Sequence, residues 1–179
     1  MRNIGRVACP IFCFQLVEGF IHTSNRNKYA LRLALFALVS EIPFNLAVNN
    51  QLIGFDSKNV FFTLLIGLLT IWAMEKLEQI HALLIIPTAA AGGILAYFIN
   101  CDYDYRGIIL IVILYLFRYH KALQTLAGAV SLYWEWPAIF AFIPINMYNG
   151  KKGWNMKNFT YVFYPAHLIL LYAISRLIQ

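Results

Sequence analysis

The stretch NVFFTLLIGLLTIWAM, residues 59–74, decides the fold class, because no side chain in it carries a charge. A segment that crosses hydrocarbon must satisfy its own backbone amides, which a helix of about 20 residues does. The whole chain of 179 residues has the same character, with 61% hydrophobic and 12% charged residues. A soluble domain is about half apolar and about a quarter charged. The sequence therefore predicts an all-α fold, a polytopic bundle of transmembrane helices.

Other apolar stretches lie on both sides of this one along the chain. Together they predict about seven spans in a single transmembrane domain that takes in the whole chain. The predicted spans are residues 7–21, 29–48, 59–74, 81–99, 107–117, 122–148 and 159–178. Small residues at positions 89–93 would let a neighbouring helix approach the fourth span closely.

Two of the predicted spans are irregular. Residues 107–117 are too few to cross a bilayer upright, so this span must tilt or take residues from the connection before it. Residues 122–148 form one long helix or two short arms that meet near residues 135–137. Pro137 disfavours helix at the residue before it, and Glu135 is costly at mid-bilayer. This favours a broken or re-entrant segment.

Basic residues gather in three of the connections and indicate the cytoplasmic side. They are Arg26, Lys28 and Arg32; Arg118 and Lys121; and Lys151, Lys152 and Lys157. Placing the second and third clusters on one side requires residues 122–148 to cross twice or re-enter. The net charge of +6 does not indicate nucleic acid, because the basic residues form short clusters between apolar stretches. The lipid bilayer is the expected partner.

Ionisable residues inside predicted spans are the first candidates for function, since each costs about 3 kcal/mol or more in hydrocarbon unless it is paired or hydrated. Helical spacing places Gln15, Glu18, His22 and Arg26 on one polar stripe. A carboxylate one turn before His22 can orient the imidazole and raise its basicity, as a general base requires. The alternative is that Glu18 and His22 lie at the headgroup level without a chemical role.

Glu41 is the second candidate, on a face shared with Asn45 and Asn49. It either pairs with a buried cation or binds a substrate amine, or it bonds backbone groups freed at a Pro43 kink or lies at the outer interface. His167 lies inside the last apolar stretch, where spacing alone favours a packing role.

The basic residues of the first connection form the third candidate group. Arg26, Lys28 and Arg32 either hold an anionic headgroup or nucleotide phosphate, or only set the topology. No metal site is predicted, because Asp102 and Asp104 lack the further oxygen ligands of a calcium loop.

Several of these segments also occur as an ordered series in a known family. The sequence resembles the TraX family of conjugal-transfer membrane proteins nearly from end to end. The resemblance rests on GRVACPIFCFQLVEGF at residues 5–20, HT at 22–23, KY at 28–29, RL at 32–33, SEIPF at 40–44, NVFFTL at 59–64, NGKKG at 149–153 and FYPAHL at 163–168.

The resemblance implies a multi-pass acetyltransferase of the bacterial cytoplasmic membrane. The family is named for acetylation of the F-pilin N-terminus and is similar to the acyltransferase type 3 group, so the implied donor is cytoplasmic acetyl-CoA. Glu18, His22, Glu41 and His167 occupy polar positions of the family motifs. Family members usually begin with another hydrophobic segment that ends in an Asp-His pair, and this sequence starts after it. Three expectations follow: the chain is a truncated reading frame, another histidine acts as base, or the protein is an inactive acyltransferase.

The leading hypothesis is acyl transfer, in which a base deprotonates an amine or hydroxyl that attacks the acetyl-CoA thioester. His22 oriented by Glu18 is the first choice of base and His167 the second. Arg26, Lys28 and Arg32 would meet the CoA phosphates, with Glu41 and Tyr164 at the substrate. The alternative is a non-catalytic membrane component or a small proton-coupled transporter that uses Glu18 and Glu41. A pilin-like peptide, a sugar and a lipid all stay open as the acceptor.

Overall fold

The computed structural model describes residues 2–49, 51, 57–150 and 157–178, and helices dominate them. Within this part of the chain no strand is present, and the all-helical prediction is confirmed. The helices are α1 (Arg2–His22), α2 (Arg26–Asn49), α3 (Val60–Glu78), η1 (Ala82–Leu84), α4 (Ile85–Phe98), α5 (Asp104–Leu116), α6 (Lys121–Ser131), η2 (Tyr133–Ala141), α7 (Phe142–Met147) and α8 (Lys157–Ile178).

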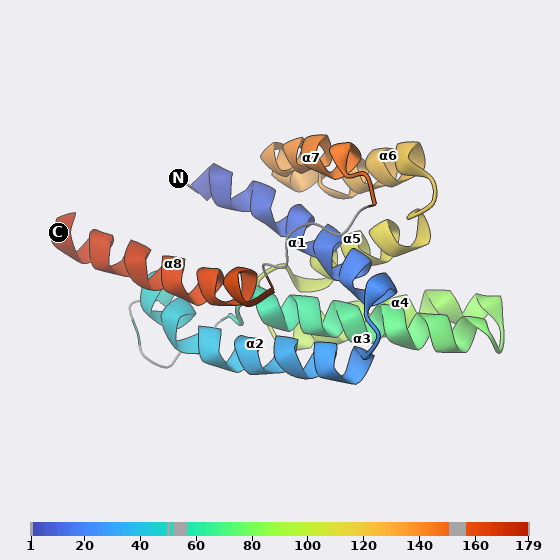
Figure 1. Cartoon of the computed structure of the whole chain (residues 1–179), viewed down its shortest axis with the longest axis horizontal. Coiled ribbons are helices and arrows are strands. Elements are labelled where there is room, and N and C mark those ends of the chain that lie inside the picture. Colours follow the sequence, from blue (N-terminus) through green and yellow to red (C-terminus); the bar gives the residue numbers. More distant parts are fainter. Residues whose placement is uncertain (1, 50, 52–56, 151–156, 179) are drawn as a thin grey trace.

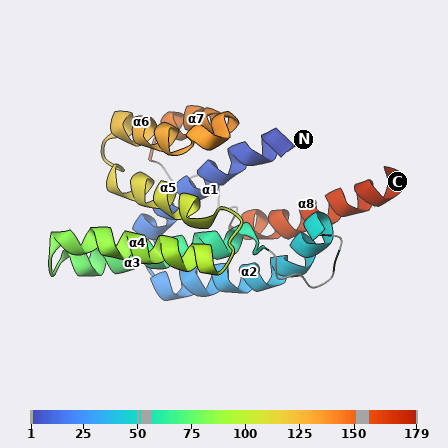
Figure 2. The ribbon, with the colours of Figure 1, turned by 180° about the vertical axis from the view of Figure 1, so that it is seen from behind.

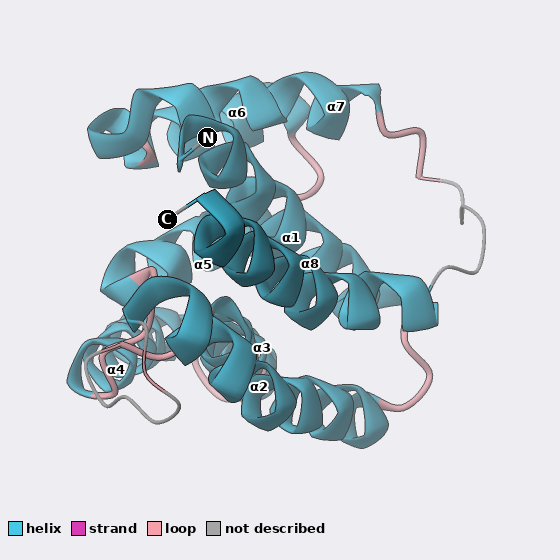
Figure 3. Cartoon of the chain, turned by 90° about the vertical axis from the view of Figure 1, so that its left-hand side faces the viewer, coloured by secondary structure: helices cyan, strands magenta, loops and turns pink. Residues whose placement is uncertain are grey.

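The helices lie in three layers, which are seen most directly end on (Figure 3). Helices α2, α3 and α4 form one outer layer, α1, α5 and α8 lie in the middle, and α6 and α7 form the other outer layer (Figures 1 and 2). Helix α1 packs on η2 and α5, α3 packs on α2, α4 and α5, and α8 packs on α2. The middle layer therefore has neighbours on both sides.

Glycines allow close contacts between helices of the bundle. A Cβ added to Gly92 of α4 would lie 2.2 Å from Oγ1 of Thr70 on α3. One added to Gly67 of α3 would lie 2.2 Å from Cδ1 of Ile111 on α5. The close approach predicted for residues 89–93 is thus confirmed at Gly92.

In the part of the chain that the structure describes, two helices are long and apolar enough to cross a membrane, Arg26–Val48 and Val60–Glu78. Ala82–Phe98 and Tyr161–Ile174 are shorter apolar helices. Large hydrophobic side chains point outward on α2, among them Leu31, Leu35 and Leu38. Such an exposed apolar stripe fits contact with lipid or another apolar surface. The count of seven spans stays a prediction.

The irregular segments follow from local backbone constraints. Helix α5 begins at Asp104, in the connection from which the sequence predicts that this short span takes residues. The backbone of Glu135 is not helical, with φ −135° and ψ 54°, so the chain breaks two residues before Pro137. After this break the chain turns back. Its two ends are joined by a hydrogen bond of 2.9 Å that Lys121 Nζ donates to the carbonyl oxygen of Tyr148.

The two ends of residues 121–148 therefore meet at the same end of the bundle. That arrangement fits the placement of the second and third basic clusters on one side. Lys151 and Lys152 of the third cluster lie outside the described residues.

Candidate functional site

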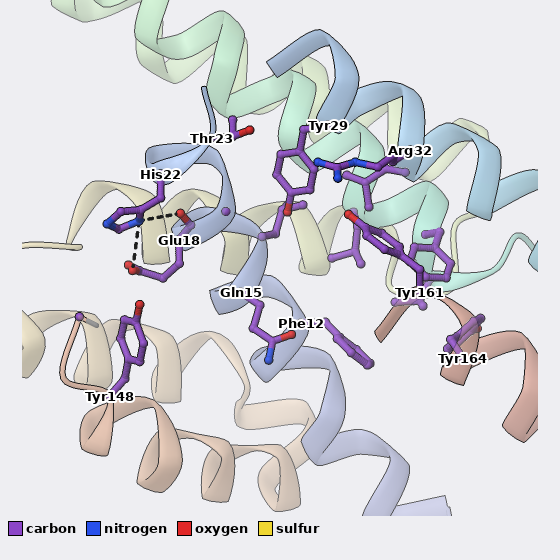
Figure 4. Close-up of a pocket in the computed structure, with 17 residues that line it drawn as sticks. Phe12, Gln15, Glu18, His22, Thr23, Tyr29, Arg32, Tyr148, Tyr161 and Tyr164 are labelled. Carbon is purple, nitrogen blue, oxygen red and sulfur yellow. Dashed lines mark hydrogen bonds and ion pairs between the residues drawn. The ribbon is translucent and has the colours of Figure 1, made fainter. Parts of the chain in front are cut away.

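A pocket of about 500 Å³ opens between α1, α2, α3, the start of α8 and the segment after α7 (Figure 4). Its volume is in the usual range for small-molecule sites. Its lining is Phe12, Gln15, Leu16, Glu18, Gly19, His22, Thr23, Tyr29, Arg32, Leu33, Val60, Phe61, Leu64, Tyr148, Gly150, Tyr161 and Tyr164. The pocket thus contains the polar stripe predicted on the first span, except for Arg26.

Glu18 and His22 lie one turn apart on α1 at the mouth of the pocket. Nδ1 of His22 lies 2.9 Å from the main-chain carbonyl oxygen of Glu18 and 3.7 Å from its carboxylate Oε2. A carbonyl oxygen only accepts hydrogen bonds, so this contact places the proton of neutral His22 on Nδ1. Nε2 then carries the free lone pair. The side chain of His22 is 63% exposed, so Nε2 is accessible to a substrate.

Tyr148 reaches the same mouth from the segment beyond α7. Its hydroxyl faces the Glu18 carboxylate (Figure 4), and its ring meets Phe14 edge-on at 5.4 Å. A phenol is protonated at neutral pH, so this hydroxyl can donate a hydrogen bond to an oxygen in the pocket.

Among the described residues that line the pocket, Arg32 carries the one permanent positive charge. Its guanidinium lies 5.9 Å from the ring centre of Tyr29, with Tyr161 nearby (Figure 4). Nε of Arg32 is buried and has no hydrogen-bond partner among the described residues.

Aromatic rings form the inner wall of the pocket. Tyr161 stacks on Phe36 at 4.8 Å, and Tyr164 meets Phe61 edge-on at 5.1 Å. These contacts fix the start of α8 against α2 and α3. An apolar group entering the pocket would lie against these rings.

The structure does not bring the three basic residues of the first connection together. Arg26 forms a two-pronged ion pair with Glu75 of α3, in which Nη2 lies 2.9 Å from Oε1. Lys28 is exposed and does not line the pocket. Of the three, only Arg32 lines the pocket, so they do not form a shared phosphate site.

Glu41 lies outside the pocket, in a polar cluster that joins α2 to α3. Its Oε1 accepts a hydrogen bond of 2.8 Å from Lys58, and its Oε2 accepts one of 2.8 Å from Asn59. Asn59 also donates to the carbonyl oxygen of Ala37 at 2.7 Å and caps α3 by accepting from the amide of Phe61. Pairing with a cation is thus the geometry observed for Glu41, and its placement among the substrate-binding residues finds no support.

His167 also lies outside the pocket lining. Its Nδ1 is 3.2 Å from the carbonyl oxygen of Phe163, and its ring stacks on Phe163 at 5.3 Å. It meets Tyr164, which does line the pocket, at 5.4 Å. His167 thus packs against Phe163 and Tyr164, as its spacing in the sequence favours, and does not line the pocket.

Sequence reasoning missed several residues of the site and its supports. Tyr29, Tyr148 and Tyr161 carry no signal of position, because tyrosines are frequent throughout the chain. Glu135, predicted only as the place of a break, is buried and pairs with Arg6 of α1 at 3.0 Å. That ion pair holds the break of residues 121–148 against the first helix.

The fold and the site define a class of protein: over its described residues the chain is helical, with two helices there apolar enough to cross a membrane, and its pocket has a Glu-His pair at the mouth. Comparison with known proteins gives the family. The model of the family described as "TraX protein" matches residues 1–175, and the chain belongs to the TraX family. The resemblance read from the sequence is thus confirmed.

A known relative is similar to this chain along its whole length. The chain is 28% identical over 214 residues to the Dichelobacter nodosus protein described as "Probable fimbrial assembly protein FimC, serogroup H1". The match covers 100% of this chain and 84% of that protein. No solved structure matches the chain.

Proposed function

We propose that this chain is a membrane acetyltransferase that transfers acetyl from acetyl-CoA to the N-terminal amine of a pilin-like protein. TraX membership and similarity to a fimbrial assembly protein support a role connected with pili. The geometry of His22 is the single observation that carries the chemistry: an accessible imidazole whose Nδ1 proton is held by the carbonyl of Glu18.

The reaction follows from that geometry. An α-amine has a pKa of about 8, so at neutral pH most of it is protonated and cannot attack a thioester. The ammonium form first releases one proton to water. Nε2 of His22 then takes a second proton from the neutral amine as its nitrogen bonds to the thioester carbonyl carbon. When the tetrahedral intermediate collapses, the C–S bond breaks and the imidazolium returns the proton to the thiolate of CoA. The products are the acetylated amine and free CoA.

Tyr148 and Glu18 have supporting roles in this scheme. The protonated hydroxyl of Tyr148 faces the mouth, where it can donate to the oxygen that becomes negative in the intermediate. The Glu18 carboxylate, 3.7 Å from Nδ1, stabilises the imidazolium formed during the transfer.

The position of Glu41 favours this function over a proton-coupled carrier. A carrier of that kind needs a carboxylate that can gain and lose a proton in the transport path. Glu41 is instead tied to Lys58 and Asn59 in a cluster that joins two helices.

The test is acetyl transfer by the purified chain in detergent. Labelled acetyl-CoA is supplied with a peptide that has a free α-amine and, as a control, with the same peptide blocked at its N-terminus. We expect label on the free peptide alone. Label on a lipid or sugar hydroxyl, and none on the peptide, would show that the acceptor is a hydroxyl and not the pilin amine. No transfer to any amine or hydroxyl would contradict the proposal.

A further inference from the structure

Arg32 occupies an unusual position for a cation. It lies on α2 about 9 Å along the helix axis from Arg26, at a rise of about 1.5 Å per residue. It is half-buried and lines the pocket, whereas His22 at the mouth is mostly exposed. Arg32 is therefore a charge inside the cavity and not at its rim.

Nothing in the described part of the chain neutralises this charge. Three other cations are paired with carboxylates: Arg6 with Glu135, Arg26 with Glu75, and Lys58 with Glu41. Arg32 forms no such ion pair with a described residue, and its Nε is buried without a hydrogen-bond partner there. Glu18 is the one carboxylate among the described lining residues, and it faces His22 and Tyr148 (Figure 4).

Leaving a guanidinium partly desolvated and unpaired is unfavourable, and the cost falls when an anion binds to it. Its planar donors match the two oxygens of a carboxylate or a phosphate. The surrounding rings of Tyr29 and Tyr161 and the inner wall at Phe61 and Tyr164 suit an apolar or aromatic body next to the anion.

We propose that this pocket binds an acidic group, a carboxylate or a phosphate ester on an apolar or aromatic body, with Arg32 as its counter-ion. This proposal rests on the proposed function, because it uses the same pocket. It narrows the substrate class to molecules that carry an acidic group. The molecule that presents its reacting group to His22 carries a negative charge farther inside.

The experiment follows the guanidinium of Arg32 directly. The full chain, labelled with ¹⁵N-arginine in detergent micelles, is titrated with benzoate, with phenyl phosphate and with neutral benzamide. The Nε–H signal of Arg32, assigned by its loss in Arg32→Lys, should move and saturate with the anions and not with benzamide. The signal of Arg118 is the matched reference, since its Nε is also buried without a described partner but Arg118 does not line the pocket.

Substitutions give a second readout through the ring signals of the pocket tyrosines. Arg32→Gln should weaken binding of the anion by about tenfold or more, and Arg118→Gln should leave it unchanged. Should Arg32→Gln fail to fold, Arg32→Lys keeps the charge and should still prefer the anion to benzamide, with lower affinity. The tighter of the two anions identifies the acidic group.

An Arg32 signal that does not respond to either anion, or that responds equally to benzamide, would overturn the proposal. The titration contains no acetyl-CoA. A negative result therefore bears on the anion site alone, while acetyl transfer is judged by its own assay.

Discussion

Nδ1 of His22 lies 2.9 Å from the main-chain carbonyl oxygen of Glu18, closer than it lies to the Glu18 carboxylate. The helix backbone therefore orients the imidazole, and the carboxylate adds charge at 3.7 Å. This division of roles differs from the sequence-based expectation, in which the carboxylate orients the ring.

Glu18→Gln tests that division. Because the substitution keeps the carbonyl that holds Nδ1, we expect acetyl transfer to fall by only about tenfold, the effect of losing one charge near the imidazolium. Initial rates at saturating acetyl-CoA measure this. A loss as large as that from removing His22 would show that the carboxylate itself orients the ring.

Asn59→Ala tests the structural role of the cluster around Glu41. The buried amide of Asn59 bonds the Glu41 carboxylate and the Ala37 carbonyl, so we expect a loss of about 1–3 kcal/mol in the free energy of unfolding. Denaturant unfolding in detergent measures it, with the exposed Asn27→Ala as control.

Glu41→Gln should leave the KM for the acceptor unchanged. A raised KM of the Glu41→Gln variant, without a loss of stability, would show that Glu41 contacts the substrate.

Gly92→Ala tests the packing of α4 on α3. The new methyl group would lie 2.2 Å from Oγ1 of Thr70, whose hydroxyl is bonded to the Ile66 carbonyl, so we expect destabilisation of about 1–3 kcal/mol. Gly93→Ala is the matched control, because its nearest neighbour is the Tyr105 Cβ at 3.4 Å. Adding Thr70→Ala to Gly92→Ala should recover part of the loss. Equal stability of the two glycine variants would contradict the close packing.

Cysteine labelling tests which ends of the bundle face the same side of the membrane. The Arg26–Glu75 ion pair joins the start of α2 to the end of α3. An isolated β-bridge between the backbones of Lys58 and Cys101 joins the residues just before α3 to those just after α4. In intact cells, Asn27→Cys and His120→Cys should therefore react alike with an impermeant maleimide, and Asn100→Cys should react oppositely. Identical labelling at all three positions would contradict a membrane crossing between them.

Features of the fold that depend on local sequence could be predicted. The uncharged run at residues 59–74 is the body of α3, and the break expected near residues 135–137 falls at Glu135. The one-turn spacing of Glu18 and His22 could also be read directly, since helix geometry alone sets it.

Features that depend on tertiary packing could not be predicted. Arg26 and Glu75 are 49 residues apart, and Arg26, paired with Glu75, does not line the pocket. Tyr148 reaches Glu18 only because the chain turns back after Glu135 and is held by Lys121. A single sequence shows that these groups are polar, but not which of them neutralise one another.

The rate of a single acetyl transfer by His22→Ala, compared with the unchanged chain, tests the central claim most directly. The exposed His81→Ala serves as control, and far-UV circular dichroism checks that each variant is folded. We predict a loss of about 10²–10⁴-fold for His22→Ala and none for His81→Ala. A folded His22→Ala protein that transfers acetyl at the rate of the unchanged chain would contradict the account.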